Sequence, residues 1–170
     1  MLGTSKEIKN PGLNILPPGV ERHVVNGGAL TAFQIFPDDE LEIINNEGNQ
    51  ICEIICFNKD GKSDAGILNL KSNNDKNFIR SILNNKDETI LATNHQLKKR
   101  NLNISDSKSS IIFDLDTKAG ESFKLKSKDK CYAIFAAPSE DMDVTNQNPP
   151  SDLTIFLSLI HISEPTRPSR

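Results

Sequence analysis

EGNQICEIICF, residues 47–57, joins a turn sequence to an unbroken run of mostly apolar residues. Side chains on a strand point alternately to its two faces. One face would carry Gln50, Cys52, Ile54 and Cys56, and the other Ile51, Glu53, Ile55 and Phe57. The stretch therefore predicts a strand that is apolar on both faces, with one carboxylate in the middle of an apolar row.

Similar short runs lie on both sides of this strand, and turn residues separate them. They are residues 20–25 (VERHVV), 30–36 (LTAFQIF), 41–44 (LEII), 110–115 (SIIFDL), 123–125 (FKL) and 131–137 (CYAIFAA). Lys59-Asp60-Gly61-Lys62 predicts a reversal, with residues 66–70 (GILNL) as the returning strand, and a last strand begins at Asp152. This rhythm is typical of antiparallel strands.

One helix interrupts the strands. Phe78, Ile79, Ile82 and Leu83 recur at spacings of three and four, which predicts a helix of about three turns capped by Asn74 or Asp75. Eight or so strands with one short helix predict an all-β fold, built as a two-sheet sandwich or a jelly-roll-like barrel.

Composition narrows the function classes. The 170 residues carry 20 basic and 23 acidic side chains, a formal net charge of −3, which argues against a nucleic-acid-binding protein. No apolar stretch approaches the length that a membrane helix requires. The three cysteines, an odd number, follow no signal peptide, so we expect reduced thiols and a cytoplasmic protein.

The expected boundaries divide the chain into three parts. Residues 1–19 predict an extended arm, and residues 20–156 predict one β-rich domain of ordinary size. Residues 157–167, LSLIHISEPTR, resemble the translation of an adapter used in sequencing libraries. We therefore expect residues 157–170 to be an artefactual tail that packs poorly or projects from the domain, and the natural protein to continue beyond residue 156.

Glu53 is the leading candidate for chemistry. Burial without a partner favours the protonated carboxyl group, which is how enzyme sites tune general acids and bases. The alternative is structural, with Glu53 paired to a lysine or arginine on a neighbouring strand or placed at a sheet edge.

The cysteines and histidines offer few further sites. Cys52 and Cys56 would lie about 13 Å apart along a strand, too far to share one zinc ion, so core packing is the expected role of these thiols. A metal site that joins Cys52 to His95 is the alternative. His95 itself is expected in a solvated loop beside residues 97–100 (LKKR), a basic run that is solvated or holds an anion, and His23 has no evident partner.

One family resemblance rests on a progression of short motifs. Residues 16–19 (LPPG) precede an Asp-rich turn and then EGNQ, with an acid three residues after Gln50. This resembles the urea-carboxylase-associated domain family, with Gly48, Asn49, Gln50 and Glu53 in the matching places and Glu where that family has Asp. The closest likeness is to versions fused ahead of an aminomethyltransferase domain similar to the glycine cleavage T-protein.

The resemblance implies an accessory role. Transfer of a one-carbon unit, with tetrahydrofolate as cofactor, would belong to a missing downstream transferase domain, and this fragment would need no cofactor of its own. It would dock, gate or bind a small polar ligand, with Asn49, Gln50 and Glu53 as the ligand-binding candidates. The alternatives are a small amidine or guanidine hydrolase centred on Glu53, and a structural homo-oligomerisation module.

Overall fold

The computed structural model describes residues 18–72, 78–83, 88–102, 104, 107–139 and 150–159. Within these ranges the elements, in chain order, are β1 (Val20–Val25), β2 (Leu30–Ile35), β3 (Glu40–Asn45), β4 (Cys52–Phe57), the 3-10 helix η3 (Ala65–Leu68), α1 (Phe78–Leu83), α2 (Glu88–Lys99), β5 (Ser110–Ile112), β6 (Ser122–Lys126), β7 (Cys131–Ala136) and β8 (Leu153–Ser158). No described helix is long and apolar enough to cross a membrane.

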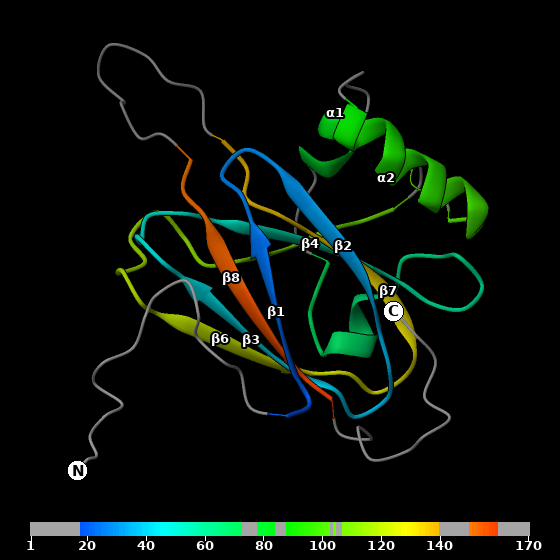
Figure 1. Ribbon diagram of the computed structural model, residues 1–170, viewed down its shortest axis with the longest axis horizontal. Coiled ribbons are helices and arrows are strands. Elements are labelled where there is room, and N and C mark those ends of the chain that lie inside the picture. The colour runs from blue at the N-terminus through cyan, green and yellow to red at the C-terminus, as the bar shows by residue number, and fades with distance from the viewer. Residues whose placement is uncertain are drawn as a thin grey trace.

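The eight strands form two antiparallel four-stranded sheets, in the orders β1-β8-β3-β6 and β2-β7-β4-β5 (Figure 1). Each of the first four strands pairs with one of the last four, in reverse chain order: β1 with β8, β2 with β7, β3 with β6 and β4 with β5. Successive crossings between the sheets give the strand order of a jelly roll, so the predicted sandwich is confirmed.

Two apolar cores hold three layers together. The inner core lies between the two sheets and takes Ile54, Cys52 and Cys56 from β4. The outer core lies between the β2-β7-β4-β5 sheet and the helices, and takes Ile55 and Phe57 from the same strand. Every residue of β4 is buried, because β4 contributes one face to each core, as its two apolar rows predicted.

The helical layer is larger than the sequence predicted. Ile79 and Leu83 of α1 pack into the outer core as expected, while the predicted capping residues Asn74 and Asp75 lie outside the described residues. The second helix, α2, was not predicted, and placing His95 in a loop was wrong. Among the described residues of α2, the buried apolar side chains are those of Ile90 and Leu97 alone. Two such residues give a helical periodicity too weak to distinguish this segment from a polar loop.

Residues 66–70 were also predicted wrongly, because η3 replaces the expected strand. Asp64 accepts a hydrogen bond from the Gly66 amide at 3.1 Å and begins the turn. Asn69, with a φ of 58°, ends it in the left-handed region. The consecutive residues Ile67 and Leu68 are both buried against the inner core, which the alternating faces of a half-buried strand would not allow.

The last strand, β8, extends past the expected boundary at residue 156 and ends at Ser158. Leu157 is 0% exposed and lies opposite Glu21 of β1 and Leu41 of β3. It continues the inward-facing alternation of Leu153 and Ile155, so the expectation of poor packing is wrong at this position. Residues 160–170, the rest of the expected tail, lie outside the described residues.

Alanine substitutions at two glycines, Gly48 and Gly120, would test how tightly the loops pack. Gly48 and Gly120 both adopt positive φ, at 78° and 85°. A Cβ at Gly48 would lie 2.7 Å from the Thr117 carbonyl oxygen, whereas a Cβ at Gly120 would meet nothing within 4 Å. We expect Gly120→Ala to lower the free energy of unfolding by about 1–2 kcal/mol, the cost of the left-handed conformation alone.

Gly48→Ala should lower the free energy of unfolding by about 2 kcal/mol more than Gly120→Ala, because the backbone of the loop must also move. Urea denaturation of the two variants measures the difference. Equal losses would show that the approach of the loop containing Gly48 to Thr117 is not a packing constraint.

Candidate functional site

The carboxylate of Glu53 is 0% exposed and lies on the outer face of β4, beneath α1. Its Oε1 accepts a hydrogen bond from the Ile79 amide at 2.7 Å. Its Oε2 accepts one from the Phe78 amide at 3.1 Å and one from the Ser109 hydroxyl at 2.9 Å. Glu53 therefore ties β4 to the first residues of α1 and to the residue that precedes β5.

This geometry explains how an acid is accommodated in an apolar row. The first amides of a helix lack partners inside the helix, and a carboxylate satisfies them while it interacts favourably with the positive end of the helix dipole. The donors that Glu53 meets in this arrangement are two backbone amides and a hydroxyl. A catalytic role of Glu53 stays a prediction.

Gln50 links distant segments at one end of the sandwich. It is almost fully buried, and its Nε2 donates to the Pro138 carbonyl at 2.8 Å and to the Ile51 carbonyl at 2.9 Å. Its Oε1 accepts from the Ser151 amide at 2.9 Å. The side chain thus joins the β3–β4 turn to the chain on both sides of residues 140–149.

Asn45 and Asn49 complete the turn around Gln50. Asn45 donates from Nδ2 to the Gln50 carbonyl at 2.7 Å, and its buried Oδ1 has no hydrogen-bond partner among the described residues. Asn49 adopts a φ of 56°, and its amide donates to the Thr117 carbonyl at 2.7 Å. Sequence reasoning missed Asn45, although an asparagine at the end of a strand before a glycine turn is a usable signal.

The three cysteines are free thiols buried in the inner core. Burial raises the pKa of Cys52, and the charge of Glu53 raises it further. A hydrogen bond with Cys131 and then burial raise the pKa of Cys56. The raised pKa values keep the thiols of Cys52 and Cys56 protonated at neutral pH, so these two cysteines are poor nucleophiles and poor metal ligands.

The candidate metal pair is not brought together. Cys52 faces the inner core, whereas His95 is exposed on α2, which lies over the opposite face of that sheet. Across the described residues, no group of three or more His, Cys, Asp or Glu side chains is placed to hold a metal ion.

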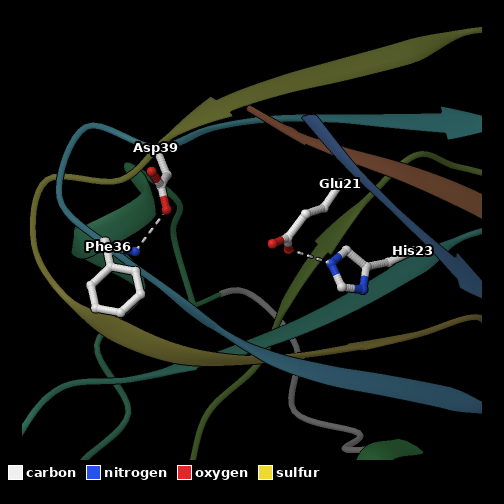
Figure 2. Close-up of polar contacts among 4 residues, drawn as sticks. All are labelled: Glu21, His23, Phe36 and Asp39. Carbon is white, nitrogen blue, oxygen red and sulfur yellow. Dashed lines mark hydrogen bonds and ion pairs between the residues drawn. The ribbon is translucent and has the colours of Figure 1, made fainter. Parts of the chain in front are cut away.

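The structure gives His23 a partner that sequence reasoning missed. Its Nε2 lies 3.2 Å from Oε1 of Glu21, and the two side chains are 25% and 36% exposed (Figure 2). The imidazole stacks on Phe33 of β2 with the ring centroids 4.1 Å apart. The E-x-H spacing on β1 was the available signal, because residues two apart on a strand share a face.

A second carboxylate, that of Asp39, has a structural role in the turn that follows β2. Asp39 is fully buried, and its Oδ2 accepts a hydrogen bond from the Phe36 amide at 3.0 Å (Figure 2). Its backbone carbonyl accepts from the Ser127 amide at 2.9 Å. Asp39 therefore closes the β2–β3 turn and holds the segment after β6 against it.

The role of Glu53 can be tested by changing its acceptor oxygens and one of its donors in separate variants. Glu53→Gln puts an amide donor opposite the donors of α1 and Ser109, and we expect it to lower the free energy of unfolding by about 3 kcal/mol. Ser109→Ala removes one hydrogen bond and should cost about 1 kcal/mol. Urea denaturation measures both values, and a Glu53→Gln variant as stable as the parent would refute the structural role.

One curated relative matches most of this chain. The chain is 31% identical over 150 residues to the trimethylamine-oxide aldolase of Ruegeria pomeroyi, an alignment that covers 88% of this chain and 19% of that protein. No family model matches the chain, so the resemblance to the urea-carboxylase-associated family stays a prediction. The relative is named as an aldolase rather than an aminomethyltransferase, and this chain spans about a fifth of its length.

Proposed function

We propose that this chain is an accessory β-sandwich domain of a longer enzyme that acts on a small methylated amine oxide. The observation that carries the proposal is the alignment, which runs through nearly the whole of this chain but through only a fifth of a trimethylamine-oxide aldolase. A stretch that aligns in this way and folds around its own two cores behaves as one module of a larger protein.

The contacts of the predicted ligand-binding residues support an accessory role. Glu53 and Gln50 use their side-chain polar atoms to join segments of the same domain, and the Asn49 amide binds a neighbouring loop. These residues hold the fold in the positions where the sequence predicted a ligand. The chemical step, and any tetrahydrofolate that it uses, would then belong to other parts of the enzyme.

The test uses the chemistry of the relative's named substrate. Loss of one methyl carbon of trimethylamine oxide as formaldehyde leaves dimethylamine, and the two products together contain all atoms of the substrate. We expect the 170-residue chain alone to release no formaldehyde from 10 mM trimethylamine oxide above a protein-free blank. Formaldehyde release that is proportional to the concentration of the chain would contradict the proposal.

Binding is measured separately, with a control for osmolyte effects. Trimethylamine oxide stabilises folded proteins at high concentration because it is excluded from their surfaces. The thermal unfolding temperature is therefore compared at 1–10 mM trimethylamine oxide and at equal sucrose. A saturating shift with trimethylamine oxide alone would add ligand binding to the accessory role.

A second candidate function rests on the pair formed by His23 and Glu21. An imidazole oriented by a carboxylate is a common general base, and hydrolysis of an amidine needs such a base to activate the water that displaces ammonia. The pair lies partly exposed at the edge between the two sheets, where β1 faces β2. This candidate replaces Glu53 with His23 as the residue that would act on an amidine or guanidine.

Ammonia release separates this candidate from the accessory role. An amidine hydrolase would release ammonia from guanidinoacetate, and His23→Gln would abolish the release while His95→Gln, a change at an exposed histidine of α2, would not. Our proposal of an accessory domain predicts no ammonia from the parent chain. Release that both variants retain would exclude His23 as the base.

A further inference from the structure

A hollow of about 240 Å³ lies on the outer side of the β2-β7-β4-β5 sheet, beside the C-terminal end of α2. Its floor is a row across three strands, in which Gln34 and Phe57 flank Tyr132. Three basic residues from three different segments surround this floor: Lys59, Arg100 and Lys130. No acidic residue is among the described residues that line the hollow.

The gathering of basic residues contrasts with the charge of the whole chain. Acidic side chains outnumber basic ones by 23 to 20, so a random surface site would offer carboxylates to its lysines and arginines. Lys59 lies in the turn that follows β4, and Lys130 directly precedes β7, whose Tyr132 pairs with Phe57 of β4. Like charges gathered at one site repel each other.

Aromatic rings, rather than carboxylates, position two of the cations. The Arg100 guanidinium lies over the Tyr132 ring, 4.4 Å from its centroid, and the Lys130 ammonium lies over the Phe36 ring at 5.8 Å. A cation held over a ring is not neutralised by a carboxylate, so its positive charge can still attract an anion. None of the three basic side chains makes an ion pair within the part of the chain that the structure describes.

Tyr132 adds a hydrogen-bond donor. Burial raises the pKa of its phenol, against the charge of Arg100 and a hydrogen bond with Arg100, which lower it. The phenol therefore remains protonated at neutral pH and can donate. The side-chain amide of Asn58 lines the same hollow, although its Oδ1 already accepts from the Asp60 and Lys62 amides.

We propose that this hollow binds the oxyanion group of a small molecule, a phosphate or a carboxylate, between Arg100, Lys59 and Lys130. Arginine's planar fork binds an oxyanion through two parallel hydrogen bonds, and the lysines add positive charge. The volume is below that of ordinary drug-sized pockets, so the site accommodates one small anionic group rather than a whole cofactor. The anion offsets the repulsion between the three cations.

Calorimetric titration of the 170-residue chain with sodium phosphate and with sodium malonate tests the proposal. Sodium chloride holds the ionic strength constant, because bulk screening would otherwise imitate a change in affinity. We expect saturable binding of at least one anion. Tighter binding of phosphate identifies a phosphate group as the natural ligand, and tighter binding of malonate identifies a carboxylate.

Matched variants locate the site. We expect the dissociation constant to rise about ten-fold in Arg100→Gln and in Lys59→Gln, because each variant loses one charge-assisted hydrogen bond to the anion. Lys124→Gln, a change at an exposed lysine of β6 in the other sheet, should leave it unchanged. Lys59 is exposed and makes no ion pair with the described residues, so Lys59→Gln keeps the test valid if Arg100→Gln unfolds the end of α2.

Two outcomes would overturn the proposal. One is the absence of saturable binding for both anions. The other is an equal affinity in Lys59→Gln, Arg100→Gln and Lys124→Gln, which would show non-specific attraction to the surface. Neither outcome bears on the accessory role proposed above, because that role is measured by formaldehyde release.

Discussion

A carboxylate without solvent contact lies in the middle of β4, and the helical layer is built over it. Glu53 accepts hydrogen bonds from Phe78, Ile79 and Ser109, so one side chain joins the strand, the first residues of α1 and the entry to β5. Burying a charge is costly unless it is paired or hydrogen-bonded. That cost favours the observed position of α1, whose first two amides donate to this carboxylate.

The same principle recurs at the ends of the sandwich. Asp39 closes the β2–β3 turn, and Gln50 joins the β3–β4 turn to Pro138 and Ser151. Buried polar groups in this domain thus connect segments far apart in sequence, while the two apolar cores supply most of the driving force. Glu53 and Gln50 use their side-chain polar atoms for these structural contacts, which supports the proposed accessory role.

The sequence predicted the strands well where one local pattern decides the structure. The alternation in residues 47–57 placed each side chain of β4 on its observed face, because both faces of that strand are buried. Longer-range effects defeated local patterns elsewhere. α2 has only two buried apolar residues, and η3 depends on the turn begun by Asp64. The sequence pattern identified Glu53 as a polar residue in a buried row. It could not identify the partners of Glu53, such as the amides of α1, because no spacing rule connects segments so far apart in the chain.

The central claim is that Glu53 holds the helical layer on β4, and amide hydrogen exchange tests it most directly. The exchange rates of the Phe78 and Ile79 amides are compared between the parent chain and Glu53→Gln, with the amides of Ile43 and Ile155 in the opposite sheet as internal controls. If Glu53 holds α1 in place, exchange at Phe78 and Ile79 should be at least ten-fold faster in the variant, with little change at Ile43 and Ile155. Unchanged protection at Phe78 and Ile79 would contradict it.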